Sequence, residues 1–239
     1  MDFTSIYLNN KSGASATVQD CIIVLEYFDA NGVRQREHLD FLCDCRETNK
    51  NDYHFVLNVW VYLFKDRQLN ARFNLISVWS NGGGHHFKTR YCQWMWHMLS
   101  VLRFSNKPIV HNFFASYHGH SLADSHAAAV KKVLHSEYNH SQVQRFSPNL
   151  MAIYWGPTNA GDVSNLITRA CANTQVHVFP HIHRDPELKP NVRRIERIKA
   201  HHCFVYTGAY CFKSILSAGT QFEQFTFLHN ISTKSLQNT

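Results

Sequence analysis

The stretch LISVWSNGGGHHFKTRYCQWMWHMLS, residues 75–100, decides the fold. Its apolar first part is typical of a buried parallel strand, and this strand ends at a run of glycines. The aromatic residues beyond the glycines recur at helical spacing and predict a helix over residues 85–102. A strand that stops at a glycine turn before a helix is where α/β folds place ligand-binding groups. Asn81, at the tip of this strand, is therefore the first candidate site residue.

The sequence before this stretch predicts three antiparallel strands and a helix. Residues 3–8 are short and β-like, and residues 17–29 carry the β-branched and aromatic side chains of a central strand. An Asn-Gly pair then predicts a hairpin turn into a third strand at residues 36–45. Residues 51–68 place apolar side chains near helical spacing, which predicts a crossover helix, although their β-branched content leaves a strand open.

The sequence after this stretch completes a known order of elements. Residues 108–116 predict another buried strand, and residues 121–138 predict a helix from their alanine content and periodicity. The order β-β-β-α-β-α-β-α is that of an RNase H-like fold, an α/β fold whose mixed sheet has three antiparallel and then two parallel strands. We assign this fold to a domain of residues 1–145.

Residues 146–239 differ in character and are expected to form a C-terminal extension of α+β type. Proline and glycine breaks open this extension, and a basic, proline-punctuated loop follows at residues 180–202. Its predicted elements are one helix and several short strands, at residues 163–172, 174–179, 203–216 and 222–228.

The amino-acid composition indicates a globular protein and narrows the kinds of partner and compartment that we expect. The chain has 239 residues, of which 44% are hydrophobic, and this is enough to bury a core. Its net charge of +7 moderately favours a polyanionic partner. The seven cysteines are scattered without a C-x-x-C pair and predict free thiols in a reducing compartment. No apolar run approaches the roughly 20 residues of a membrane span, so we expect a soluble, intracellular protein with no membrane partner.

Three ends of strands and helices meet in an RNase H-like fold, and each carries a polar residue in this sequence. They are Asp2 at the start of the first strand, Asn81 at the end of the fourth and Asp124 in the helix after the fifth. Carboxylates at these places hold two Mg²⁺ or Mn²⁺ ions roughly 4 Å apart for in-line attack on a phosphodiester. The chemistry needs acids because Mg²⁺ is a hard ion that prefers charged oxygen ligands.

Three segments resemble eukaryotic DNA-transposon transposases of the DDE/D type. SNGGGHHFKTRY at residues 80–91 is similar to their Ser-Asp-Gly and Phe-Lys motif. HNFFASYHGHSLADSHAAAVKK at residues 111–132 is similar to their Phe-Phe-Ala-x-x-His-Gly-Lys block, which an Asp and a Lys-ending helix follow. DFTSIYL at residues 2–8 is similar to their Asp-Phe first-strand motif.

The resemblance covers residues 2–135 and implies an RNase H-like domain for DNA cleavage and strand transfer in the nucleus. Asp2, Asn81 and Asp124 stand at its catalytic and metal-binding positions. Asn81 replaces the second Asp of the motif, and His120 replaces the Lys after His-Gly. An amide is a weaker Mg²⁺ ligand than a carboxylate, so we expect the metal to be weakly held or lost and the activity impaired or absent. Because the sequence starts one residue before Asp2, we expect a truncated or domesticated relative without a separate N-terminal DNA-binding domain.

Basic side chains on the transposase-like segments predict a surface that faces DNA. The residues of this predicted surface are Lys88, Arg90, His118, Lys131 and Lys132, with Arg193, Arg194 and Arg197 as further candidates. A solvated helix face explains the lysines equally well. The sequence leaves open whether the chain forms homo-oligomers.

Each predicted site residue also has an ordinary structural interpretation. Asp2 can be a frayed, solvated acid, and Asn81 can be a turn former. Asp124 can be an N-terminal helix acid that complements the helix dipole. Two further acids, Asp40 and Asp44, could replace the missing charge, but a solvated edge of the third strand is the favoured account of both.

Two other functions compete with a transposase-derived enzyme. The first is a domesticated, non-catalytic DNA-binding module, and Asn81 is the feature that separates it from an enzyme. The second is a zinc-stabilised interaction protein, because imidazole and thiolate are the preferred ligands of zinc. Its candidate ligands follow no zinc-finger spacing and are His177, His181, His183, His201, His202 and Cys203.

Overall fold

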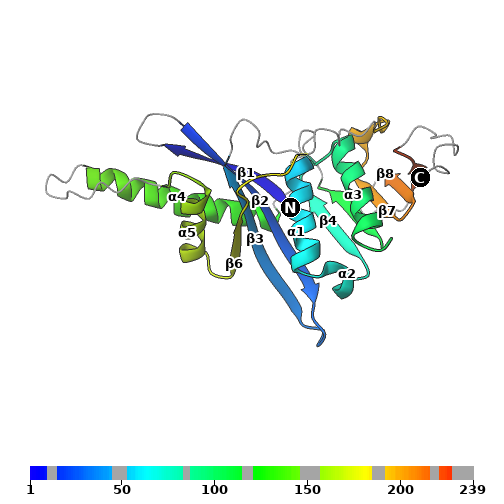
Figure 1. Ribbon diagram of the computed structural model, residues 1–239, viewed down its shortest axis with the longest axis horizontal. Helices are drawn as coiled ribbons and strands as arrows, with labels where there is room; N and C mark the ends of the chain where they lie inside the picture. Colours follow the sequence, from blue (N-terminus) through cyan, green and yellow to red (C-terminus); the bar gives the residue numbers. More distant parts are fainter. Residues whose placement is uncertain are drawn as a thin grey trace. The chain divides into compact units, whose positions relative to one another are not determined.

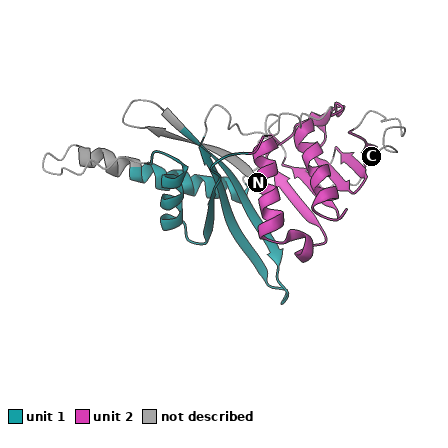
Figure 2. Ribbon diagram, viewed as in Figure 1, with its two compact units in different colours: residues 1–51, 120–182 teal, residues 52–119, 183–239 magenta. Residues whose placement is uncertain are grey.

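The computed structural model contains two compact units, each built from two separate parts of the chain (Figure 1, Figure 2). Unit 1 comprises residues 1–51 and 120–182, and unit 2 comprises residues 52–119 and 183–239. For part of the chain only the backbone is described, namely residues 2–9, 15–16 and 138–145. The residues that the structure describes are 1–9, 15–44, 53–82, 87–114, 121–145, 157–184, 192–215 and 221–227.

Unit 1 contains a four-stranded sheet in the order β1-β2-β3-β6. The first three strands pair antiparallel, as the sequence predicts, and β6 joins β3 in parallel. The strands are β1 (Asp2–Asn9), β2 (Ser15–Phe28), β3 (Arg34–Asp44) and β6 (Thr174–Val178). The short strand predicted at residues 174–179 is thus confirmed and completes this sheet.

The turn between β2 and β3 falls at the Asn-Gly pair that predicts it. Gly32 takes the left-handed conformation with φ of 76°, which glycine adopts without strain. The Asp29 carboxylate accepts hydrogen bonds from the backbone N–H groups of Asn31 at 2.9 Å and Val33 at 3.0 Å. These bonds hold the turn and with it the antiparallel register of the hairpin.

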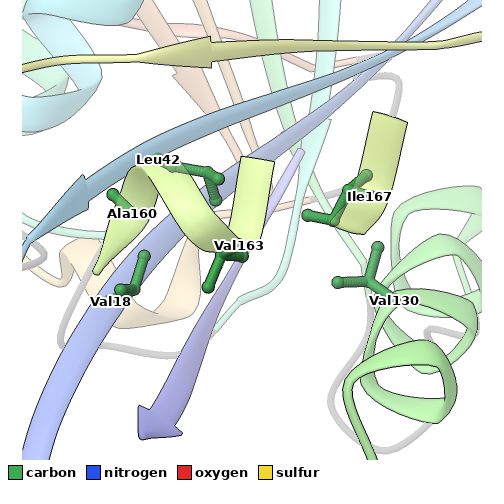
Figure 3. Packing of buried hydrophobic residues seen from close by; sticks show 6 residues of the cluster. All are labelled: Val18, Leu42, Val130, Ala160, Val163 and Ile167. Atoms are coloured by element: carbon green, nitrogen blue, oxygen red, sulfur yellow. The ribbon is translucent and has the colours of Figure 1, made fainter. Parts of the chain in front are cut away.

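Two helices, α4 (Leu122–Arg145) and α5 (Ala160–Ala170), lie against the sheet of unit 1 (Figure 1). Asp44 Oδ1, at the end of β3, accepts a hydrogen bond from Ala160 N at 2.8 Å and so holds the start of α5. The solvated edge predicted for Asp44 is therefore wrong, because β3 is an interior strand and its last residue caps a helix. Buried side chains of β2, β3, α4 and α5 form a hydrophobic cluster (Figure 3): Val18, Leu42, Val130, Ala160, Val163 and Ile167.

Unit 2 contains a five-stranded sheet in the order β4-β5-β7-β8-β9. β4 and β5 are parallel, as predicted for the fourth and fifth strands, and the other neighbours are antiparallel. The strands are β4 (Ile76–Ser80), β5 (Ile109–Phe113), β7 (Cys203–Thr207), β8 (Tyr210–Ser214) and β9 (Glu223–Phe225). The helices are α1 (Tyr53–Asp66), α2 (Leu69–Arg72), α3 (Arg90–Leu102) and the short 3₁₀ helix η2 (Ile198–Ala200).

In unit 2, α3 packs on the sheet and α1 packs on α3. Trp96 of α3 is fully buried between the rings of Trp60 of α1, with centroids 4.9 Å apart, and His111 of β5, with centroids 5.3 Å apart. The Thr89 hydroxyl accepts a hydrogen bond from Cys92 N at 3.2 Å and caps α3. This cap makes α3 begin later than the predicted residue 85.

The α/β class expected from the sequence is confirmed, and α1 is a helix rather than the alternative strand. Among the described residues, the strands expected in one RNase H-like sheet are divided between two sheets, with β1 to β3 in unit 1 and β4 and β5 in unit 2. A single RNase H-like sheet stays a prediction. The boundary expected after residue 145 does not coincide with the division into units, because β6 joins the sheet of unit 1 and β7 to β9 join the sheet of unit 2.

Candidate functional site

The carboxyl ends of β4 and β5 bring parts of two transposase-like segments side by side. Phe114 N donates a hydrogen bond to Ser80 O at 3.1 Å, just beyond the paired strands. A Cβ atom at Gly82 would stand 3.1 Å from Phe114 O, so glycine permits this close approach. Asn81, between Ser80 and Gly82, is exposed at this end of the strands.

A buried histidine lies beside this end of β4. His111 Nε2 and Ser80 Oγ are 2.7 Å apart, and both residues have no exposed surface. Burial is the main cause that lowers the pKa of His111 to about 3, so its imidazole is neutral at physiological pH. The other ring nitrogen, Nδ1, is buried and has no hydrogen-bond partner in the described structure. His111 is therefore poorly suited to carry a proton near neutral pH.

Lys88 precedes α3 and is buried, with 4% of its surface exposed. Its Nζ atom lies 5.0 Å from the centre of the Phe113 ring, in a cation–π contact. Burial lowers the pKa of Lys88 to about 8. Among the described residues, no carboxylate forms an ion pair with this ammonium group. The end of β5 thus contains a buried cation without a counter-ion from the described protein.

Hydrogen bonds to α3 and β7 fix the turn that carries Lys88. Gln93 Nε2 donates to Phe87 O at 2.8 Å, and Tyr206 OH donates to Gln93 Oε1 at 2.5 Å. Phe87, Gln93 and Tyr206 are all buried. Phe87 and Lys88 are the Phe-Lys pair of the transposase-like motif. The hydrogen bond from Gln93 therefore fixes this pair to α3, and the bond from Tyr206 to Gln93 connects it to β7.

The three predicted metal-binding positions are divided between the units. Asn81 belongs to unit 2, whereas Asp2 and Asp124 belong to unit 1. Asp2 begins β1 in register with Ile22 of β2, and its side chain lies outside the described part of the structure. The convergence of the three positions in one pocket stays a prediction.

Asp124 forms a capping box at the start of α4. Ser121 N and Ser121 Oγ each donate a hydrogen bond to Asp124 Oδ2 at 2.7 Å, and Asp124 N donates to Ser121 Oγ at 3.1 Å. This is the helix-terminal role that the sequence offers as the alternative to metal binding. One carboxylate oxygen of Asp124 is therefore already engaged by the helix cap.

The residues predicted to face DNA differ in exposure. Arg90 is exposed in the first turn of α3, and Lys131 and Lys132 are exposed on α4. His118 lies outside the described residues. Lys88 differs from the exposed members because it is buried. The further basic candidates are also exposed: Arg193, Arg194 and Arg197.

A second polar cluster, which the sequence did not reveal, lies in unit 1. Asp20 of β2 and Asp40 of β3 both have no exposed surface. They stand diagonally across the two strands, because Asp20 pairs with Leu42 and Asp40 pairs with Ile22. His126 Nε2, from α4, lies 2.8 Å from Asp40 Oδ2. We call Asp20, Asp40 and His126 the acid cluster of unit 1.

The acid cluster leaves three carboxylate oxygens without hydrogen-bond partners in the described structure, both of Asp20 and Oδ1 of Asp40. Burial, and then the charge of Asp40, raises the pKa of Asp20 well above its ordinary value and favours its neutral form. The solvated edge predicted for Asp40 is wrong, because β3 is an interior strand and Asp40 is buried against His126. The sequence signal for Asp20 is an acid inside the apolar run TVQDCIIVL at residues 17–25.

The residues of the zinc hypothesis are divided between the units. His177 lies in unit 1, where its ring stacks on Phe41 with centroids 5.2 Å apart. His201, His202 and Cys203 lie in unit 2, where Cys203 is buried in β7. No group of three or more His, Cys, Asp and Glu side chains in the described residues is arranged to hold a metal ion. The described geometry gives the zinc hypothesis no support.

No disulfide joins the cysteines of the described part, which exclude Cys45, as the sequence predicts. No helix among the described residues combines the length and apolarity needed to cross a bilayer. Comparison of the chain with protein-family models, curated proteins and solved structures finds no match.

Proposed function

We propose that the chain is a transposase-derived, RNase H-like domain that binds DNA through its phosphate groups and has little or no catalytic activity. The observation that carries the proposal is the grouping of motif residues in unit 2. Asn81 follows the end of β4, and Lys88 lies against the ring of Phe113, the last residue of β5. Lys88 contributes a buried positive charge there, and a phosphodiester would supply the missing negative charge.

The order of elements supports the same ancestry. From β1 to α4, the chain first forms three antiparallel strands and a helical segment. Two parallel strands follow, and each of them is followed by a helix. The net charge of +7 and the exposed Arg90, Lys131 and Lys132 favour a polyanion as the partner. A domain of this descent would act on DNA in the nucleus.

The described side chains do not fit a two-metal centre. Asn81 offers one neutral amide oxygen, and Asp124 Oδ2 already accepts two hydrogen bonds from Ser121. Mg²⁺ and Mn²⁺ prefer charged oxygen ligands, so both ions are expected to bind weakly. This misfit favours an impaired enzyme over an active one, and it also supports the second candidate, a domesticated DNA-binding module without catalysis.

Binding of duplex DNA is expected to weaken steeply with salt and to depend little on sequence, because neutralised phosphates release counterions. Arg90→Gln, Lys131→Gln and Lys132→Gln should each reduce the slope of log affinity against log salt by about 1 for a lost phosphate contact. Fluorescence anisotropy with labelled duplexes of unrelated sequence measures this slope. Lys65→Gln, at an exposed position at the end of α1, is the matched control and should leave the slope unchanged. Affinity that is indifferent to salt, or absent at low salt, would contradict the proposal.

Asn81→Asp is expected to raise the affinity for Mg²⁺ and Mn²⁺, because a carboxylate replaces a neutral amide oxygen. Isothermal titration of both ions against the native and variant chains measures the change. Asn165→Asp adds the same charge at an exposed position of α5 and should not change metal affinity. If Asn81→Asp does not bind metal either, the non-catalytic DNA-binding module becomes the better account.

The native chain is expected to show no Mg²⁺-dependent cleavage of DNA. Cleavage with ordinary turnover that Asp124→Ala abolishes would show that Asn81 is compatible with catalysis. Ser121→Ala is the control for this variant, because it removes hydrogen bonds of the capping box and keeps the Asp124 carboxylate. Cleavage that Ser121→Ala and Asp124→Ala reduce equally would indicate the loss of the helix cap instead.

A further inference from the structure

Two nitrogen-bearing side chains, those of Lys88 and His111, lie beside the ring of Phe113 at the end of β5. Lys88 Nζ lies 5.0 Å from the centre of the Phe113 ring, and the centre of the His111 ring lies 4.3 Å from it. Phe113 N donates a hydrogen bond to His202 O at 2.8 Å, which brings the backbone of His202 to the same strand end. In the described structure, Nδ1 of His111 and Nδ1 of His202 are buried without hydrogen-bond partners. Lys88 Nζ and the ring of His111 therefore lie beside one residue, and the backbone of His202 is bonded to the same residue.

The positive charge of Lys88 affects the pKa of both His111 and His202. It lowers the pKa of His111 and the pKa of His202, in each case after the larger effect of burial. The three side chains therefore oppose positive charge on one another. An anion among them would reverse this effect, since a negative charge stabilises each protonated nitrogen.

Hydrogen bonding at His111 agrees with an acceptor in this place. When Ser80 Oγ donates to His111 Nε2, across 2.7 Å, the imidazole proton stands on Nδ1. His111 Nδ1 is then a donor without an acceptor in the described structure, and the Lys88 ammonium group has no carboxylate partner among the described residues. Oxyanions such as phosphate carry several acceptor oxygens and bind to such sets of donors.

Packing alone does not account for a lysine at this position. A buried ammonium group without a counter-ion destabilises the folded state, whereas methionine would fill a similar volume without charge. With its pKa lowered to about 8, Lys88 still carries its charge at neutral pH. The folded protein therefore keeps a destabilising charge in a place where it can serve a ligand.

We infer that Lys88, His111 and His202 form a binding site for a phosphate group, whose negative charge takes the place of the counter-ion that the described residues do not supply. The inference deepens the proposed function and rests on it for the identity of the group as a phosphate of DNA. A free phosphate ion and a phosphodiester share this chemistry, so the experiment uses both.

The first experiment titrates inorganic phosphate into the full chain at constant ionic strength, with chloride as the reference salt. Phosphate is expected to raise the midpoint of thermal unfolding by roughly 5 to 10 °C at about 100 times its Kd. Lys88→Met should be at least as stable as the native chain without phosphate and should lose this response. Lys65→Met, at an exposed position of the same unit, should keep the response. A response as large in Lys88→Met as in the native chain, or none in the native chain, overturns the inference.

The native protein provides a second measurement that needs no variant. Nuclear magnetic resonance of ¹⁵N-labelled lysine side chains follows the titration of the Lys88 ammonium group. Phosphate is expected to raise the pKa of Lys88 from about 8 toward the ordinary value of a lysine. A Lys88 titration that phosphate leaves unchanged overturns the inference.

Duplex DNA in place of phosphate separates this inference from the proposed function. DNA that competes with phosphate and binds Lys88→Met with a salt slope smaller by about 1 supports both. Phosphate that binds at Lys88 while DNA does not compete overturns the DNA function and leaves the phosphate site. DNA that binds the native chain and Lys88→Met equally overturns Lys88 as a DNA contact and leaves the proposed function.

Discussion

Asp20→Asn is expected to stabilise unit 1 above neutral pH and to flatten the fall of its stability with pH. Burial, and then the charge of Asp40, raises the pKa of Asp20 in the folded unit, so the folded state keeps a proton that the unfolded state releases. The stability from this proton is fully present below the unfolded pKa of about 3.9 and is lost as pH rises through the folded pKa. Asparagine has no such proton to lose, and its amide N–H group can donate to the unpartnered Asp40 Oδ1. We expect a gain of about 1 to 3 kcal/mol at alkaline pH and little change at acid pH.

Hydrogen exchange of backbone amides in β2 and β3 measures this effect within unit 1, after correction for the intrinsic pH dependence of exchange. Glu137→Gln on α4 is the control, because it removes a carboxyl group of the same unit that is not fully buried. A stability of β2 and β3 that rises with pH in the native chain, or an equal response in Asp20→Asn, would show that Asp20 is ionised in the folded unit.

His126→Ala is expected to destabilise unit 1 by about 3 to 5 kcal/mol, as the removal of one partner from a buried pair does. His126 Nε2 and Asp40 Oδ2 are 2.8 Å apart, and their side chains are 7% and 0% exposed. Without the imidazole, the Asp40 carboxylate would stay buried with no donor among the described residues. Urea-induced unfolding followed by circular dichroism, together with exchange of β3 amides, measures the loss.

His135→Ala is the matched control for this prediction, because His135 is exposed on the same helix. Its effect should stay within about 0.5 kcal/mol. His126→Gln keeps a side-chain N–H donor and should recover part of the loss. If His126→Ala is no more destabilising than His135→Ala, then the contact between His126 and Asp40 does not stabilise unit 1.

Local chemistry made the individual elements predictable. The β-branched run of β2, the turn at Gly32 and the alanines of α4 each act over a few neighbouring residues, and the structure has a strand, a turn and a helix at these places. Strand pairing depends on contacts that no local pattern contains. β6 pairs in parallel with β3, where Val176 is the partner of Asp40, and the sequence predicts the strand without its neighbour. The assignment of the strands to two sheets is a long-range property of the same kind.

Burial explains why charge alone was an incomplete guide to the candidate sites. Lys88 was predicted to face DNA because it is basic, but its distinctive feature is that the fold encloses it. Asp20 was not predicted at all, because the apolar residues around it indicate only a strand, and α4 covers it from far along the chain. Asp124 is the opposite case. Its capping box with Ser121 can be recognised from the spacing of the two residues, and the structure contains it.

The alternation of the two units along the chain has a consequence for protein synthesis. β1, β2 and β3 are made first, but β6, which completes their sheet, follows only after residues 52–119 of unit 2 and two further helices have been made. β5 likewise has no partner on one edge until β7 has been made. During translation, one edge of β3 and one edge of β5 therefore present unpaired backbone N–H and C=O groups for the time needed to add many residues, and such edges can pair with other chains. A chain that stops before β7 would not simply lack a separable domain, because it would keep β5 with one unpaired edge. The order of the strands along the chain therefore makes the nascent or shortened chain prone to aggregation.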